Sequence, residues 1–296
     1  MFTRKKGRLA TDNVGYLMIA PFILFFFFFI LLPLIMTFLL SFTSYNLLIM
    51  KFVGLRNYFD LFSDFFFIQA IKNTGIYTFF TLIITIVLSL IIATILNEEV
   101  FFRKVFRTVY FLPHITSMVA VSLIWLWMFE PSQGTFNRIL TLLGIQRINW
   151  LDETKWALPS LIFMAVWKTI GYNIVIFLAG LQTIPEYLYE AATIDGASKL
   201  QKFFHITIPL LAPVTFFLFV TGLIFNFNVF EQVLIMTDGG PSNSTTTIVH
   251  QVYLRAFSEF FMGYASAISC VATAIVLVIT LINFKYGSKK TDIGMG

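Results

Sequence analysis

Charged residues are scarce in this sequence. Only 12% of its 296 residues are Asp, Glu, Lys or Arg, whereas 58% are hydrophobic and 37 are phenylalanine. A typical soluble domain carries roughly 25% charged residues. So little polar surface cannot cover a globular protein in water, and the composition therefore predicts that lipid forms part of the solvent. The net charge of +5 is divided into small groups at the ends of apolar segments, which is not the basic stripe of a nucleic-acid-binding protein.

Cysteine and the common catalytic motifs are nearly or wholly absent. The single Cys270 excludes an internal disulfide and a cysteine-rich metal site, and we interpret it as a packing residue. The three histidines, His114, His205 and His250, lie in separate segments and do not predict a metal site. No phosphate-binding loop, His-Glu-x-x-His pair or Gly-x-Ser-x-Gly turn is present. We therefore expect no enzymatic activity, no metal and no cofactor bound by this chain; a membrane-embedded enzyme would need clustered catalytic residues near one interface.

Long apolar segments predict an all-α membrane protein with six transmembrane helices. We expect the spans at residues 14–40, 74–96, 109–129, 156–184, 209–236 and 263–284, within a transmembrane domain at 14–285 that is flanked by tails at 1–13 and 286–296. The first span is far longer than a signal-peptide core of roughly 7–15 residues, and Pro21 and Pro33 are expected to kink it. Short helices outside the spans are predicted near 57–62, 135–143 and 245–261. Trp125 and Trp127 are expected in an interfacial aromatic belt.

Basic residues favour one side of these six spans. Twelve lie on the side of both termini: Arg4, Lys5, Lys6, Arg8, Arg103, Lys104, Arg107, Lys199, Lys202, Lys285, Lys289 and Lys290. Seven lie on the other side: Lys51, Arg56, Lys72, Arg138, Arg147, Lys155 and Arg255. The positive-inside rule then places both termini and residues 185–208 in the cytoplasm.

The polar segment at residues 185–208 is predicted to be a short helix, a glycine turn and a second short helix. Pro185 suits a first helical turn, the alanines that follow are strong helix formers, and Gly196 breaks the run. The unit presents the acids Glu190 and Asp195 outside the bilayer.

The order of residues in this segment resembles a family signature. Glu190-Ala191-Ala192, then Gly196, Ile206, Ile208 and Pro209, is similar to the cytoplasmic "EAA" loop of binding-protein-dependent ABC importer permeases, with Ile208 where leucine is usual. The resemblance implies the type I permease fold. It also implies a coupling helix that docks into an ATPase subunit through Glu190, Ala191, Ala192, Asp195, Gly196, Ala197 and Pro209. The alternative is an ordinary amphipathic loop helix, because Glu-Ala-Ala alone is common.

Further motifs resemble the carbohydrate (maltose-type) branch of that family. They are Asn226-Phe227-Asn228, residues 236–241, Leu112-Pro113, Trp125-x-Trp127 and residues 181–189. The resemblance implies half of a heterodimeric pore in the cytoplasmic membrane of a bacterium or archaeon, which imports a sugar or oligosaccharide by alternating access. The implied partners are a second homologous permease, two ATPase subunits that bind ATP and Mg, and an extracytoplasmic solute-binding protein. The rival reading, a self-contained secondary carrier or channel, would need intramembrane carboxylates and internal repeats.

Polar residues within the spans are the candidates for a substrate path, because hydrocarbon penalises them. They are Asn226, Asn228, Glu231, Gln232, Lys168, Tyr172 and Asn173. The spacing of Asn228, Glu231 and Gln232 places them on one face of a helix. Aromatic rings beside amides suit sugars, since rings stack on C–H faces and amides bind hydroxyls. The alternatives are hydrogen bonds that hold the bundle together and an ion pair between Lys168 and Glu231.

Overall fold

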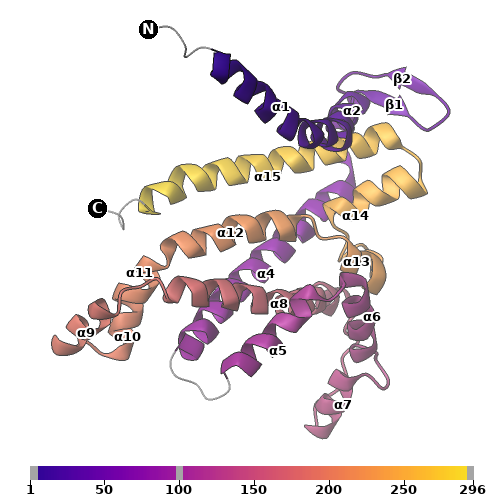
Figure 1. The fold of residues 1–296 in the computed structure, drawn as a ribbon. Helices are drawn as coiled ribbons and strands as arrows, with labels where there is room; N and C mark the ends of the chain where they lie inside the picture. Colours follow the sequence, from indigo (N-terminus) through magenta and orange to yellow (C-terminus); the bar gives the residue numbers. More distant parts are fainter. Residues whose placement is uncertain (1–5, 98–102, 292–296) are drawn as a thin grey trace. The chain divides into compact units, whose positions relative to one another are not determined.

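The chain forms two compact units in a computed structural model that describes residues 6–97 and 103–291 (Figure 1). One unit comprises residues up to Phe62 together with Val252–Val271, and the other comprises Ser63–Gln251 together with the residues from Ala272 onward. Helix α15, Met262–Thr291, contributes to both units. The ends of both predicted tails (1–5 and 292–296) lie outside the described residues, as do residues 98–102.

The first unit begins with a long apolar helix that is interrupted near proline. Helix α1, Lys6–Phe26, continues through a π-helical turn, Phe27–Leu31, into α2, Leu32–Leu40. Pro33 lies in the first turn of α2, where it cannot donate a backbone hydrogen bond to the preceding turn, and a π-helical turn accommodates that loss. Pro21 lies inside α1 without ending it.

A β-hairpin and a short helix follow α2. Strands β1, Thr43–Tyr45, and β2, Met50–Phe52, pair antiparallel, with Thr43 opposite Phe52. Helix α3, Arg56–Ser63, confirms the short helix predicted near 57–62. The predicted outside helix at 245–261 is α14, Ile248–Tyr253, and a π-helical turn, Leu254–Ser258, before α15 begins.

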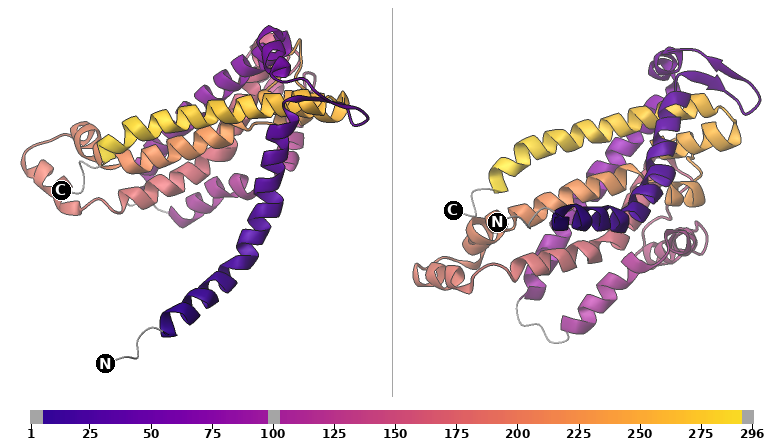
Figure 2. Two further views of the ribbon diagram at one scale, coloured as in Figure 1. Left: turned by 90° about the horizontal axis from the view of Figure 1, so that it is seen from above. Right: turned by 45° about the horizontal axis from the view of Figure 1, so that its top comes forward.

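Three long helices form the centre of the second unit. Helix α4, Phe65–Asn97, packs against α8, Thr154–Leu181, and against α12, Ala212–Phe227; the views in Figure 2 show the three side by side. Their buried side chains form one core cluster that includes Leu82, Phe177 and Leu218. Helix α5, Arg103–Ile115, packs on α8, and Gly171 permits the close approach, because a Cβ there would lie 1.7 Å from the Tyr110 carbonyl oxygen.

An aromatic cluster fills the opposite end of this unit. Helix α6, Met118–Met128, and α7, Thr135–Leu142, the latter confirming the predicted helix at 135–143, meet α8 there. Trp125 is only 4% exposed and its ring lies 5.3–5.6 Å from those of Phe136, Phe163 and Trp167. The prediction that Trp125 belongs to an interfacial belt is therefore wrong, because the ring fills the core, whereas Trp127 is 84% exposed.

The remaining helices of this unit are short. They are α9, Glu186–Ile194, α10, Lys199–Lys202, a π-helical turn, Phe203–Thr207, α11, Ile208–Leu210, and α13, Glu231–Met236.

The structure has four to six candidate membrane spans, because two of the six predicted spans are sharply bent. Among the described residues, four apolar helical segments are long enough to cross a membrane, and the number rises to six if each of two bent pairs counts as one span. The third span bends by 107° between Thr108–Ile115 and Met118–Met128, and the fifth bends by 62° between Lys199–Leu210 and Ala212–Phe227. The predicted continuous helices at 109–129 and 209–236 are therefore wrong in this respect, and the second also ends early, at Phe227.

Candidate functional site

The polar segment at 185–208 has the predicted helix–turn–helix form. Pro185 precedes α9 in an extended conformation, and Gly196 follows the helix with a φ of +78°. The Gly196 amide donates to the Thr193 carbonyl at 3.1 Å, and the Ala197 amide donates to the Ala192 carbonyl at 2.9 Å. This pair of bonds is a Schellman motif, whose left-handed position favours glycine. Helix α9 therefore ends where it does because Gly196 can adopt the left-handed conformation that this motif requires.

Side-chain hydrogen bonds fix the second half of the segment. Ser198 and Gln201 form a reciprocal capping box at the start of α10. Lys202 Nζ donates to Thr193 Oγ1 at 2.6 Å, which ties α10 to α9, and the hydroxyls of Tyr189 and Thr207 lie 2.9 Å apart. The two short helices are thus held as one preformed unit.

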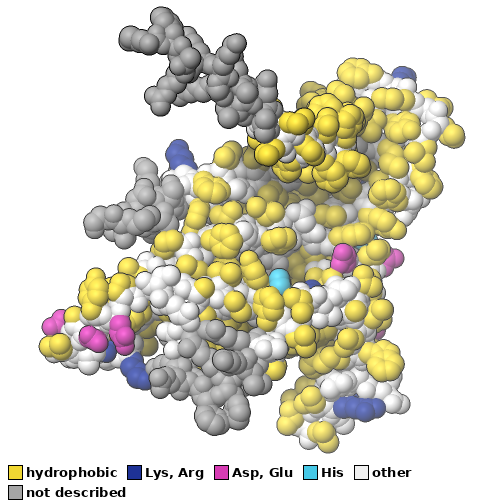
Figure 3. All heavy atoms as spheres, viewed as in Figure 1, with side chains coloured by type: hydrophobic (Ala, Val, Ile, Leu, Met, Phe, Trp, Pro, Cys, Tyr) yellow, Lys and Arg dark blue, Asp and Glu magenta, His cyan; other side chains and the backbone are white. Residues whose placement is uncertain are grey.

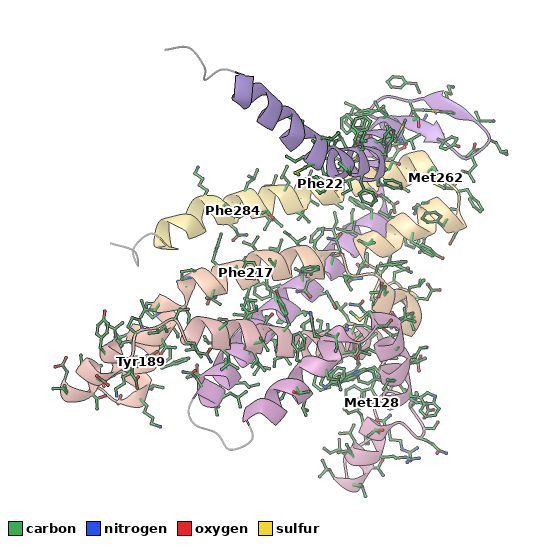
Figure 4. The ribbon with its side chains drawn as sticks, in the orientation of Figure 1. Phe22, Met128, Tyr189, Phe217, Met262 and Phe284 are labelled. Carbon is green, nitrogen blue, oxygen red and sulfur yellow. The ribbon has the colours of Figure 1, made fainter. Side chains whose placement is uncertain are left out.

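The outer surface of this segment is exposed and mixed in character. Glu190, Ala191, Asp195 and Gly196 are exposed, as are Ile194 and Leu200, and Ala192 and Ala197 are half-buried. Pro209 lies within the half-turn of α11, before the bend into α12. In Figure 3 acidic and basic side chains gather over α9 and α10, while most of the visible surface is hydrophobic. Figure 4 shows Tyr189 at one end of the second unit and Met128 at the other.

All seven substrate-path candidates line one cavity of about 650 Å³ in the second unit. Lys168, Tyr172 and Asn173 come from α8, Asn226 and Asn228 from the end of α12, and Glu231 and Gln232 from the start of α13. Pockets that bind small molecules commonly measure about 300–1,000 Å³ and combine apolar walls with a few polar groups. The cavity therefore has the size and lining of a ligand path.

Lys168 holds the bend in the third span. Its Nζ donates to three backbone carbonyls, at 3.1 Å to Pro113, 3.3 Å to His114 and 2.6 Å to Thr116. These carbonyls are at the broken end of α5, which carries the negative end of the helix dipole; of the three, the Pro113 carbonyl also accepts the Thr116 amide, at 3.3 Å. The alternative of an ion pair is therefore wrong: within the described parts of the chain, no carboxylate oxygen of Glu231 comes within 4.0 Å of Lys168 Nζ.

The predicted shared helix face for Asn228, Glu231 and Gln232 is also wrong. Helix α12 ends at Phe227, Asn228 caps it, and Glu231 opens a separate helix. Gln232 is 4% exposed and its amide donates to the Tyr77 hydroxyl at 2.7 Å, which joins α13 to α4. Gln232 therefore has the bundle-holding role that was the alternative to a role in the substrate path.

Several cavity-lining residues did not stand out in the sequence. His114 stacks on Tyr172, with ring centroids 4.7 Å apart and an interplanar angle of 20°. Phe225 and Phe230 add further rings to the lining. Only the position of His114 after Pro113, where a helix is expected to weaken, could have indicated that it faces a cavity.

A hydrogen-bond network outside the spans encloses His250. The side chain is 1% exposed, with Nε2 3.2 Å from Asp238 Oδ1 and Nδ1 3.2 Å from Thr246 Oγ1. Because a carboxylate only accepts, the proton of the neutral ring is on Nε2. Burial lowers the pKa of His250 below its usual range, and the hydrogen bond to Asp238 opposes that shift.

Two other features of the structure add no candidate site. A surface hollow of about 710 Å³ between α6 and α7, lined by Trp127, Glu130 and Arg138 among others, contains none of the seven candidates. Across residues 6–97 and 103–291, no group of three or more His, Cys, Asp or Glu side chains could hold a metal ion. The polar segment at 185–208 and the 650 Å³ cavity are therefore the candidate sites.

Comparison with known proteins gives a consistent result. Residues 85–286 match the model of the family described as "binding-protein-dependent transport system inner membrane component". The chain is 38% identical over 273 residues to the arabinooligosaccharides transport system permease protein of Bacillus subtilis (strain 168), covering 91% of this chain and 87% of that protein. It is 36% identical over 245 residues to the sn-glycerol-3-phosphate transport system permease protein of Agrobacterium fabrum (strain C58 / ATCC 33970), covering 82% and 83%.

Solved structures show the same fold. A chain of a bacterial ABC transporter involved in the import of the acidic polysaccharide alginate superposes with a TM-score of 0.85 and 28% identity, over 95% of this chain and 97% of that one. A bacterial alginate ABC transporter in complex with an alginate pentasaccharide-bound periplasmic protein gives a TM-score of 0.82 at 28% identity, over 93% and 94%.

Proposed function

The chain belongs to the family of binding-protein-dependent transport system inner membrane components, and we propose that it serves an ATP-driven importer of a sugar or oligosaccharide. It is a multi-pass permease subunit with the fold of an ABC importer permease. The alternating-access path would run through the 650 Å³ cavity. The observation that carries the proposal is the preformed helix–turn–helix at Glu186–Lys202, because its motif and exposed surface suit docking to an ATPase.

Uncharged sugars suit the cavity better than an anion such as glycerol phosphate. Lys168 and Glu231 bring opposite charges to the lining, and the ammonium group of Lys168 already bonds three carbonyls. Tyr172 and His114 offer stacked rings for C–H faces of a sugar, and Asn173 offers an amide for its hydroxyls. The arabinooligosaccharide permease among the similar proteins supports the carbohydrate class.

The remaining parts of the proposed machine are other chains. A second homologous permease would complete the pore, two ATPase subunits would bind ATP and Mg, and an extracytoplasmic solute-binding protein would deliver the sugar. This chain itself would bind no cofactor. Both termini and the coupling segment would lie in the cytoplasm, as the distribution of Lys and Arg favours. Closure of the ATPases would push the coupling helices together and open the pore outward.

The docking role can be tested with two matched glycine variants. Gly196 and Gly144 both have positive φ, +78° and +73°, and a Cβ at either position meets nothing within 4 Å. Gly144 closes α7 with the same Schellman pair of hydrogen bonds. Valine at either position therefore adds a similar backbone strain of about 1–2 kcal/mol. Only Gly196→Val changes the segment that is expected to contact the ATPase.

The measurement is co-purification of the detergent-solubilised permease with its ATPase, followed by sugar uptake in proteoliposomes. We expect Gly196→Val to lose the ATPase and uptake while remaining in the membrane, and Gly144→Val to retain both. Unchanged co-purification and uptake in Gly196→Val would contradict the coupling role. A permease that transports solute in liposomes without ATP would instead support a secondary carrier.

A further inference from the structure

The β-hairpin of the first unit has an unusually apolar tip. Its turn and second strand read Asn46-Leu47-Leu48-Ile49-Met50-Lys51-Phe52, and all seven residues are exposed. Leu48 is 91% exposed and Phe52 76%. All three residues of β2 are exposed. Its apolar side chains are therefore left uncovered on both faces of the strand. A water-exposed hairpin would ordinarily carry polar turn residues at this point.

The backbone of the turn also adopts a conformation that is unfavourable for the residue it contains. Leu47 has a φ of +70°, a left-handed conformation in which Gly or Asn is the usual residue. The Asn46 side chain accepts the Ile49 amide at 2.9 Å and so supports the turn. Leucine at the tip is therefore not explained by turn chemistry.

Helix α3 continues the same apolar surface. Leu55 lies directly before α3, and its carbonyl accepts the Phe59 amide at 3.2 Å. Leu55, Phe59 and Phe62 recur at intervals of four and three residues, which places them on one side of the helix and its first turn, and they are 55–76% exposed. The opposite face is fixed by Asn57, whose amide donates to the carbonyls of Ser41 at 2.8 Å and Thr43 at 2.9 Å. Helix α3 is thus held with its apolar face outward.

Two span ends locate this surface at the boundary of the membrane. The hairpin begins at Thr43, directly after the first apolar span ends at Leu40, and the last span begins at Met262. Those two ends touch, because a Cβ on Gly263 would lie 1.9 Å from the Thr43 carbonyl oxygen. The root of the hairpin therefore lies at the depth where both spans leave the hydrocarbon.

We propose that Leu47–Phe52 and the Leu55, Phe59 and Phe62 face of α3, here named the apolar projection, insert into the membrane leaflet at the C-terminal end of the first span. Lipid covers both faces of a hairpin, whereas a protein partner covers one. Apolar residues beside an exposed basic residue, here Lys51, are typical of segments that lie 5–10 Å into the headgroup boundary. The proposal rests on the membrane location of the chain and not on the identity of its substrate.

The test uses a polarity-sensitive NBD label on single cysteines in the whole transporter, reconstituted in phosphatidylcholine liposomes. Cys270→Ser provides the background, and Leu48→Cys reports on the tip; an exposed side chain there can be replaced without loss of packing. Asp152→Cys, in an exposed polar loop, is the aqueous control. Leu24→Cys, within the first span, is the hydrocarbon control.

We expect spin-labelled lipid with its quencher near the headgroups to reduce the Leu48→Cys signal by about twofold, since insertion is shallow, and iodide to leave it unchanged. Asp152→Cys should respond to iodide alone. A Leu48→Cys label that behaves like Asp152→Cys would overturn the proposal. So would a label that is protected from iodide without quenching by lipid, particularly if the protection depends on added solute-binding protein, because a protein would then cover the projection.

Discussion

Replacing Lys168 tests whether the bend in the third span depends on this side chain. Lys168→Met keeps most of the aliphatic packing and removes the ammonium group that bonds the carbonyls of Pro113, His114 and Thr116. Each buried carbonyl left without a donor costs at least about 1 kcal/mol. The Pro113 carbonyl keeps the Thr116 amide as a donor at 3.3 Å, so the carbonyls of His114 and Thr116 are left without one and together give about 2 kcal/mol. Removing the charge adds no further cost, because it also removes the desolvation cost that Lys168 bears in the native state.

A double-mutant cycle with Glu231→Gln separates this role from an ion pair. The two charges share a cavity but lie more than 4.0 Å apart in the part of the chain described here. We therefore expect Glu231→Gln to change the free energy of unfolding little, and the coupling energy to stay below about 1 kcal/mol. A direct buried pair would give about 3–5 kcal/mol on loss of one partner.

The assay is reversible unfolding of the purified permease in mixed micelles, followed by fluorescence of its five tryptophans. The wild type, both single variants and the double variant are measured under one set of conditions. A coupling energy of about 3 kcal/mol, or Lys168→Met as stable as the wild type, would refute the reasoning.

Two further substitutions test packing and protonation. Gly171→Ala should lower the melting temperature, because its Cβ would lie 1.7 Å from the Tyr110 carbonyl oxygen and overpacking costs about 1–3 kcal/mol; Gly75→Ala, whose Cβ meets nothing within 4 Å in α4, should be neutral or stabilising. The folded-state pKa of His250 lies below its usual value of 6.5, so the unfolded chain takes up the proton first. The stability from the neutral ring is therefore complete above pH 6.5 and declines as the pH falls toward the folded-state pKa.

Each of these two tests, of helix packing at Gly171 and of protonation at His250, has a matched control variant in the same chain. Equal melting temperatures for Gly171→Ala and Gly75→Ala would contradict the close contact of α5 with α8. For the protonation test, melting temperatures at pH 7.5 and 5.5 should differ less in His250→Gln than in the wild type. The exposed His205 gives the matched control, His205→Gln, which should keep the wild-type pH dependence. An unchanged dependence in His250→Gln would show that another group is responsible.

Local chemistry made the coupling segment predictable. Helices in lipid must satisfy their own backbone groups, so long apolar runs already identify the spans. The segment between the fourth and fifth spans contains its own stop and start signals, Gly196 and the capping pair Ser198 and Gln201, and these determine α9 and α10 without distant contacts. The predicted helix–turn–helix is confirmed because each of its turns depends on residues fewer than about seven positions away.

The bend in the third span and the break after Phe227 depend on contacts between distant residues, and a periodic pattern cannot show them. Lys168 is 52–55 residues from the carbonyls that it bonds in the third span. Gln232 is 155 residues from the Tyr77 hydroxyl that holds α13 after the fifth span has ended. The i, i+3, i+4 spacing of Asn228, Glu231 and Gln232 predicted one continuous helix because nothing local opposes it. The structure breaks that helix at Asn228 in favour of the distant bond.

The breaks nevertheless explain why the seven candidates meet in one cavity. Non-helical backbone at membrane depth is tolerated only where it is buried in protein or lines a cavity. His114 and Met118 lie on either side of the first break, Asn228–Phe230 form the second, and all of them line the 650 Å³ cavity. Polar side chains gather where the helices end because the freed carbonyls and amides need partners. The polarity of the seven candidates therefore does indicate that they line a cavity, but the first use of several of these polar groups is to bond the ends of the broken helices, as with Lys168 and Gln232.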